Sequence, residues 1–205
     1  MNRIFTPASK ENSDQASELL YATMGKFADA TLGMGSHELC MLGINGLFKK
    51  RGNRFSHDCT HLLWQDEKTA GLLLSFPGWQ FNRRAAKIGL QAWSVYGFNV
   101  TIRMLLNSLK VLTAKETEKD EYYIAHLAVH PDFRRMGIGN DLIDHAAALA
   151  RQAGLGKVSL IVEIDNDPAI ALYQKAGFET IHTTETPELV DKFHTPGFHR
   201  MVKNI

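Results

Sequence analysis

The stretch Tyr122–Gly154, YYIAHLAVHPDFRRMGIGNDLIDHAAALARQAG, joins a predicted strand, a glycine turn and a long helix in one piece. Its first part is rich in aromatic and β-branched residues and ends at Pro131, as strands commonly do. From Asn140 the apolar residues recur at three- and four-residue steps, which predicts a helix that ends at Gly154. The turn Arg134–Gly139 is therefore expected at the N-terminus of a helix.

A turn in this position can bind phosphate. The first turn of a helix has free backbone N–H groups and a partial positive charge, and both attract phosphate oxygens. Gly137 and Gly139 allow close approach of a ligand, while Arg134 and Arg135 add charge of the same preference. An ordinary turn with solvated arginines is the alternative. The dinucleotide and Walker loops are excluded, because a third glycine is missing at Leu142 and Gly-Lys-Ser/Thr is absent.

Two motifs in this order resemble the cofactor motifs of the GNAT superfamily of acetyl-CoA-dependent N-acetyltransferases. The first is the turn itself, which fits Arg/Gln-x-x-Gly-x-Gly/Ala and follows Leu127-Ala128-Val129-x-Pro131. The second reads Asn166-x-x-Ala169-x-x-Leu172-Tyr173-x-Lys175-x-Gly177-Phe178. The resemblance covers Glu121 to Ile181 well, whereas the N-terminal half matches poorly.

The resemblance implies acetyl-CoA as cosubstrate and a sheet that opens between the strands Ile124–Val129 and Val158–Ile164. The pantetheine arm would lie in this opening on the backbone of Leu127 and Val129, with the pyrophosphate on the amides after Arg134. Asn166 would lie beside the cofactor, although it could also be only a turn residue. The residues expected at the cofactor are Leu127, Ala128, Val129, Arg134, Arg135, Met136, Gly137, Ile138, Gly139, Asn140, Asn166 and Tyr173.

In such an enzyme an amine attacks the thioester directly, and the resemblance assigns Tyr173 the proton for the departing thiolate. A tyrosine that merely packs on a helix is the alternative. The general base is open, because Tyr123 occupies the position where the family often has Glu. Glu121 lies two residues earlier on the same face and is the candidate catalytic base, or else a plain carboxylate at a strand end. His126 points to the opposite face unless a bulge reverses the alternation.

Composition narrows the remaining classes of function. With 205 residues, 44% of them hydrophobic, the chain suits one domain, 1–205. A net charge of +1 argues against nucleic acid as a partner. Cys40 and Cys59 read as reduced thiols, and no metal-ligand spacing occurs among the histidines, so no metal is expected. The chain has no apolar run of about 18 residues and no signal peptide, so we expect no membrane partner and a cytoplasmic location.

The order of elements predicts an α/β fold, a mixed twisted sheet flanked by helices, as in the GNAT-type acyl-CoA N-acyltransferase fold. The predicted helices are 13–32, 36–50, 140–153 and 168–176. The predicted strands are 3–6, 60–64, 70–76, 122–129, 157–164, 178–182 and 198–203.

Residues 79–115 depart from the family pattern as a helical insertion, with helices expected at 83–88 and 98–112. No Asp or Glu occurs between Lys68 and Lys115, which predicts either a solvated basic face or a lid that favours anionic or amphipathic acceptors. Its apolar residues should pack on the body or on a second subunit, as in a homodimer. A small-molecule amine is the expected acceptor. The alternatives are a protein amine, a longer acyl group, or an acyl-CoA-binding regulatory module with weak catalysis.

Overall fold

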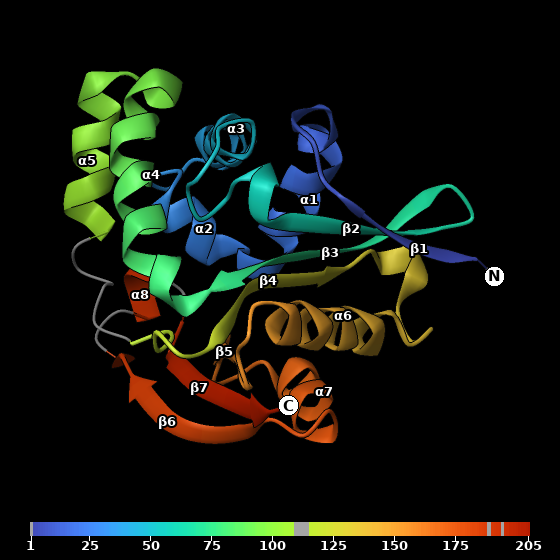
Figure 1. The fold of residues 1–205 in the computed structure, drawn as a ribbon. Helices are drawn as coiled ribbons and strands as arrows, with labels where there is room; N and C mark the ends of the chain where they lie inside the picture. Colours follow the sequence, from blue (N-terminus) through green and yellow to red (C-terminus); the bar gives the residue numbers. More distant parts are fainter. Residues whose placement is uncertain (1, 109–114, 188–189, 194) are drawn as a thin grey trace.

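The computed structural model describes residues 2–108, 115–187, 190–193 and 195–205 (Figure 1). One mixed sheet of seven strands has the order β1-β2-β3-β4-β5-β7-β6, and β4 and β5 are its parallel pair. This confirms the predicted fold class. The strands are β1 (Arg3–Pro7), β2 (Thr60–Gln65), β3 (Lys68–Pro77), β4 (Tyr122–Val129), β5 (Lys157–Glu163), β6 (Glu179–Glu185) and β7 (Gly197–Asn204).

Helices cover both faces of the sheet, so that two apolar cores form, one on each side (Figure 1). The first core lies under α1 to α5, and the second under α6 and α7. The helices are α1 (Ser13–Met24), α2 (Lys26–Thr31), α3 (His37–Phe48), α4 (Phe81–Tyr96), α5 (Phe98–Ser108), α6 (Ile138–Gln152), α7 (Asp167–Lys175) and α8 (Val190–Phe193). In the part of the chain just described, no helix is both long and apolar enough to span a bilayer.

The N-terminal half differs from its prediction at two helices and one turn. Helix α4 (Phe81–Tyr96) is much longer than the helix expected over 83–88. The single helix expected over 13–32 is broken at Gly25, whose φ of 53° lies outside the helical range, into α1 and α2. The hairpin turn is shorter than expected, because Asp66 and Glu67 both have positive φ, 49° and 65°. Two left-handed residues form the tight turn that matches the twist of paired strands, so β2 and β3 extend to the turn.

The sheet opens between β4 and β5. Their register pairs are Tyr122 with Val158, Tyr123 with Ser159 and Ile124 with Leu160, and the pairing ends there. Past this point β4 remains paired with β3, and β5 remains paired with β7. The opening predicted from the family resemblance is thus confirmed.

A bulge lies in β4 at the same level as the end of this pairing. Leu74 pairs with His126 and Ser75 pairs with Ile124, so Ala125 is an extra residue on β4. Such an insertion shifts the alternation of side chains by one residue. The half of β4 that borders the opening is therefore out of phase with the half that precedes it.

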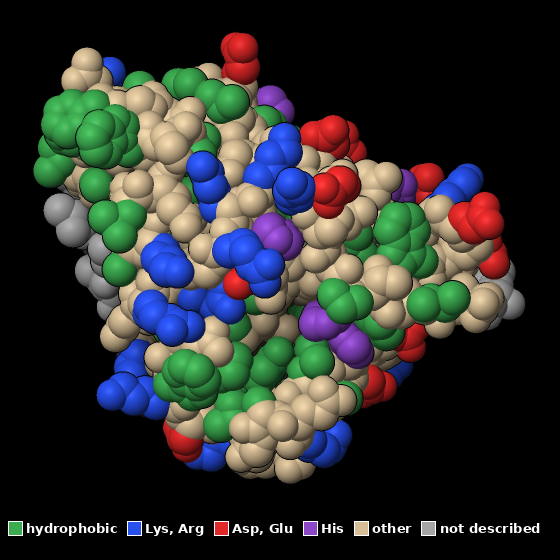
Figure 2. Space-filling view, turned by 45° about the horizontal axis from the view of Figure 1, so that its top comes forward, with side chains coloured by type: hydrophobic (Ala, Val, Ile, Leu, Met, Phe, Trp, Pro, Cys, Tyr) green, Lys and Arg blue, Asp and Glu red, His purple; other side chains and the backbone are tan. Residues whose placement is uncertain are grey.

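The insertion is built from α4 and α5, and the last residues of the helix predicted over 98–112 lie outside the described residues. It packs on the first core through Ala92, Tyr96 and Met104. Leu90 and Trp93 on its outer side remain 78% and 63% exposed. Figure 2 shows hydrophobic side chains gathered at the end of the molecule where Figure 1 places these two helices.

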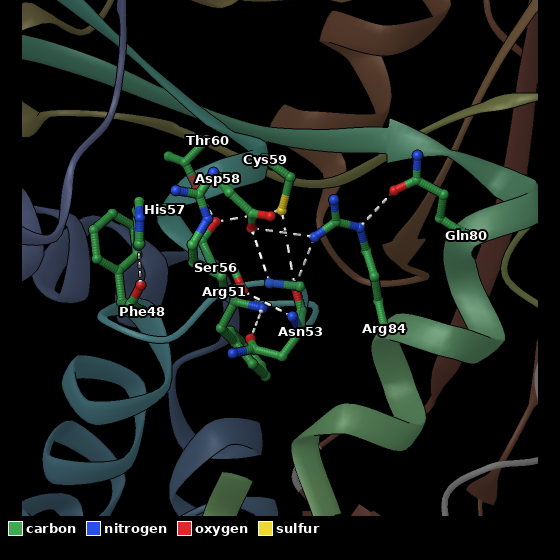
Figure 3. Close-up of polar contacts among 12 residues, drawn as sticks. Phe48, Arg51, Asn53, Ser56, His57, Asp58, Cys59, Thr60, Gln80 and Arg84 are labelled. Atoms are coloured by element: carbon green, nitrogen blue, oxygen red, sulfur yellow. Dashed lines mark hydrogen bonds and ion pairs between the residues drawn. The ribbon is translucent and has the colours of Figure 1, made fainter. Parts of the chain in front are cut away.

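Arg84 anchors the insertion to the loop between α3 and β2 (Figure 3). Its guanidinium donates to the carbonyl of Asn53 at 3.1 Å and forms an ion pair with Asp58 at 3.3 Å. The same group lies over the ring of Phe76, and the residue is only 7% exposed. The acid-free stretch that contains Arg84 was predicted to form either a solvated basic face or a lid. Arg84 itself does not fit a solvated face, because it is buried at the loop and its charge is matched by Asp58.

Candidate active site

The open edge of β4 directs two backbone N–H groups into the gap. The N–H of His130 donates to the carbonyl of Ala70 on β3, at 2.9 Å. Backbone groups alternate along a strand, so Ala128 also points to β3, whereas Leu127 and Val129 point away from it, toward the opening. The structure thus brings two of the three predicted strand residues to the gap by their backbone, and not Ala128.

The turn that follows carries a row of N–H groups without internal partners. Over residues 135–139, which the structure describes in full, no hydrogen bond engages the backbone N–H groups. Gly137 caps α6 with a left-handed φ of 83°, and Arg135 also has a positive φ, 61°. The N–H of Asn140 bonds back to the carbonyl of Gly137 at 3.1 Å, so this predicted residue has a partner already. Both arginines of the turn are exposed.

Arg3 fixes this turn from the neighbouring strand β1, and sequence reasoning missed it. Its guanidinium donates to Asp141 at 2.5 Å, to the carbonyl of Met136 at 2.6 Å and to Gln65 at 3.0 Å. Arg3 thus engages the carbonyl of Met136 in the turn and leaves the N–H groups of the turn without a partner in the described part of the chain. No local pattern marks this contact, because Arg3 and Asp141 are far apart in the sequence.

The second motif forms α7. Asn166 accepts a hydrogen bond from the N–H of Ala169 at 3.3 Å and so caps the helix. The helix therefore begins at Asp167, one residue earlier than the expected start at residue 168. Tyr173 is buried and packs edge-on against Phe178, with ring centroids 5.7 Å apart. Burial raises the pKa of Tyr173 to about 12, so the phenol keeps its proton at neutral pH.

Glu121, the predicted base, lies in a buried ion pair. Both of its carboxylate oxygens accept from Arg200 at 2.5 Å, and one also accepts from Thr117 and from the N–H of Glu118. Burial alone would raise its pKa, but the hydrogen bonds from Arg200 and Glu118 outweigh it and hold the pKa of Glu121 below its usual value. A carboxylate with its lone pairs occupied is a weak proton acceptor, so this geometry favours another group as base.

Tyr123 belongs to a second buried network on the same face of β4. Its hydroxyl donates to Glu116, and Arg54 donates to both oxygens of that carboxylate, at 2.9 and 2.5 Å. The guanidinium of Arg54 lies 4.4 Å from the centre of the Phe81 ring. Burial and the Glu116 charge raise the pKa of Tyr123 well above 10. Tyr123 thus ties the loop before β2 to the segment before β4.

The bulge at Ala125 turns His126 to the face covered by α1, which sequence reasoning allowed only on that condition. Its Nδ1 lies 2.8 Å from the hydroxyl of Thr23, and that hydroxyl donates its proton to the carbonyl of Leu20. Nδ1 must therefore carry the hydrogen, which leaves Nε2 as an acceptor. Burial and the nearby Arg54 lower the pKa of His126 to about 3.

Glu163 ends β5, three residues past the last residue paired with β4, and was not among the predicted residues. Burial, with the charge of Asp165, raises its pKa to about 6. A sequence signal existed, because Glu163 is the one acidic residue in the otherwise largely apolar strand predicted over 157–164. The face on which it lies, however, depends on the sheet register.

The remaining reactive groups lie apart from the opening. Cys40 and Cys59 are free and buried, and burial raises the pKa of each thiol to about 12, so neither is a good nucleophile. Among the described residues no group of three or more His, Cys, Asp or Glu could hold a metal. An open hollow of about 650 Å³ lies at the β1–β2 side and shares no residue with the predicted site. Figure 2 shows Lys and Arg side chains gathered near the middle of the face that it presents.

Comparison with known proteins agrees with this geometry. The family described as Acetyltransferase (GNAT) family matches residues 44–178. An acetyltransferase of Pectobacterium atrosepticum is 43% identical over 56 residues, 27% of this chain and 40% of that protein. A mycothiol acetyltransferase of Saccharomonospora viridis is 46% identical over 63 residues, 31% of this chain and 20% of that protein. The matches thus span less than half of these relatives.

The fold is shared over nearly the whole chain. The crystal structure of an N-acetyltransferase from Staphylococcus aureus superposes with a TM-score of 0.75 and 20% identity, covering 97% of this chain and 99% of the other. The family match spans more than half of the 205 residues and includes the opening of the sheet, the turn before α6 and the tyrosine of α7. The chain therefore belongs to the GNAT acetyltransferase family.

Proposed function

We propose that this protein transfers an acetyl group from acetyl-CoA to a primary amine by direct attack on the thioester. The observation that carries the proposal is the continuity of two binding surfaces. The free N–H groups of Leu127 and Val129 on β4 lead directly into the unpartnered N–H groups of residues 135–139. An extended chain with amides at one end and phosphates at the other fits both.

Each surface suits one part of acetyl-CoA. The pantetheine arm carries amides, and these can bond to the edge of β4 as an added strand would. The pyrophosphate suits the N-terminus of α6, where Gly137 allows close approach and Arg134 and Arg135 add positive charge. Asn166 caps α7 directly after β5, and we propose that it lies beside the cofactor at the same opening.

Tyr173 is the residue we assign to the leaving group. Its raised pKa keeps the phenol protonated, and a thiolate that leaves nearby is a suitable acceptor for that proton. No covalent intermediate is needed, since the two cysteines are buried and remain thiols. Free thiols also suit a reducing compartment such as the cytoplasm. Glu121 is engaged by Arg200, so we assign it to the stability of the sheet rather than to proton transfer.

The acceptor we propose is a small molecule, with a protein amine as the alternative. A longer acyl group, or binding of acyl-CoA without turnover, would use the same two surfaces. One experiment separates these functions: release of free CoA thiol is measured against a panel of amines, peptides and acyl-CoA donors. The buried cysteines should keep the background low. Turnover with acetyl-CoA and a small amine is expected. Tight binding of acetyl-CoA without thiol release on any acceptor would instead indicate the regulatory module.

A further inference from the structure

Glu163 lies on the same face of the sheet as the first core. Ser159 on β5 pairs in register with Tyr123, whose side chain belongs to the core under α1 to α5. Side chains alternate along a strand, so Glu163, four residues after Ser159, points to this face as well. Its register partner on β7 is Phe198. Because pairing with β4 ends at Leu160, Glu163 borders the opening.

The surroundings of Glu163 are apolar on one side and lack a matching cation. Phe198 packs edge-on against Phe27 of α2, with ring centroids 5.8 Å apart, and both are half-buried. Among the described residues no side-chain hydrogen bond or ion pair reaches the carboxylate of Glu163, and Asp165 adds charge of the same sign. A half-buried carboxylate without a partner is unfavourable, and a bound cation would offset that cost.

The other titratable groups near this side of the opening are engaged, farther away or too weakly basic. Asp29 on α2 accepts from the hydroxyl of Tyr21 and pairs with His37, and Glu116 is held by Arg54 and Tyr123. Arg200 on β7 is matched by Glu121. His182 on β6 pairs in register with Arg200 and so lies one strand farther from the opening. His126 on β4 is held neutral with a pKa of about 3, which makes it a poor acceptor for the proton of an amine. Among the groups compared, the carboxylate of Glu163 is the base that borders the opening without a partner.

We infer that Glu163 binds the acceptor as an ammonium ion and takes its proton, so that the acceptor is a cationic primary amine with an apolar substituent against Phe27 and Phe198. This inference rests on the proposed acetyl transfer. One N–H bond of the ammonium breaks and its proton passes to the carboxylate of Glu163. The neutral amine then forms the C–N bond as the C–S bond breaks. The thiolate takes the phenolic proton of Tyr173. The second proton lost from the nitrogen restores the phenol, and Glu163 releases to solvent the proton that it took from the ammonium.

The first test compares Glu163→Gln with the matched control Asp165→Asn, using benzylamine as acceptor. Glu163→Gln should lower kcat/KM about 100-fold, the lower end of the usual contribution of a general base. It should also remove the acid limb of the pH profile near pH 6, while affinity for CoA stays unchanged. Asp165→Asn should keep the rate and move that limb to lower pH, because a repelling charge is gone. A Glu163→Gln enzyme with the parent's kcat/KM and pH profile would overturn the inference.

A second readout does not need turnover and separates this inference from the proposed function. The ¹³C resonance of the Glu163 carboxyl, assigned with Glu163→Gln, is titrated with pH in the CoA-saturated protein. Benzylamine hydrochloride should lower the pKa of Glu163, and benzyl alcohol should not. If no amine is acetylated but the shift occurs, the transfer function fails and the ammonium site stands. If benzylamine causes no shift, or no more than benzyl alcohol does, the ammonium site is wrong even for an active enzyme.

Discussion

Arg200 on β7 and Glu121, the residue just before β4, form a buried ion pair across the intervening strand β5, with both carboxylate oxygens 2.5 Å from one guanidinium nitrogen. The pair joins the two halves of the sheet on either side of the opening. Removing one member of such a pair leaves the other charge buried without a partner.

Glu121→Gln should therefore act on stability. We expect a loss of about 3 kcal/mol in the free energy of unfolding, measured by urea denaturation. The acid limb of the pH profile for acetyl transfer should remain where it is in the parent. Loss of that limb, with stability unchanged, would instead restore Glu121 as the general base.

Gly137→Val should weaken CoA binding, measured by calorimetry. A β-branched side chain is strained at φ of 83° and obstructs approach to the N–H groups beside it. Gly154→Val is the matched control, because Gly154 has φ of 71° and ends the same helix away from the turn. The control should lose comparable stability and keep its affinity. Equal affinities in the parent and Gly137→Val would place the pyrophosphate elsewhere.

Tyr173→Phe should lower kcat by about 100-fold and leave CoA affinity nearly unchanged, because the lost proton matters when the thiolate leaves. Tyr122→Phe provides the comparison, since Tyr122 is also a buried tyrosine but its hydroxyl faces Ser75. Rapid mixing of enzyme and substrates shows whether thiolate release is the slow step. If it is, and kcat of Tyr173→Phe equals that of the parent, Tyr173 has no part in proton transfer.

Arg84→Ala should destabilise the protein by about 2 to 3 kcal/mol, since Asp58 and the carbonyl of Asn53 lose their partner. Its neighbour Arg83 is exposed, and Arg83→Ala should change stability by no more than about 0.5 kcal/mol. Urea denaturation of both variants measures the difference. Similar small effects would return Arg84 to a solvated basic face.

His145 should make stability depend on pH. Its ring stacks on Phe5 with the ring centroids 3.9 Å apart, and the ring centroid of His61 lies 4.8 Å away. Burial, and to a lesser extent the charge of His61, lowers the pKa of His145 to about 4. The unfolded chain binds this proton near pH 6.5 and the folded chain only near pH 4, so stability is full above about pH 6.5 and falls toward pH 4. The difference in unfolding free energy between parent and His145→Gln should change by up to about 3 kcal/mol over this range. A constant difference would contradict the shift.

Local patterns predicted most elements of the fold, because period-two and period-3.6 runs are read within one segment. They failed where a single residue or a distant partner decides the outcome. Gly25 lies in an otherwise helical run, and nothing nearby marks the break. Arg84 looked like a surface charge, since Asp58 meets it only after α4 packs on the loop. The candidate site shows the same limit. Motifs predicted the turn before α6 and Tyr173 as site residues, whereas the face on which Glu163 lies follows from the register of β5 with β4 and β7.

The extra residue Ala125 makes β4 unusually sensitive to length. Deleting Ala125 would restore strict alternation, so one half of the strand would have to turn over. Either the core residues Tyr122 to Ile124 would change sides, or the N–H groups of Leu127 and Val129 would turn toward β3. A one-codon deletion here should therefore cost more activity than any single substitution in the strand. Relatives can be compared position by position along β4 only after their bulges are aligned.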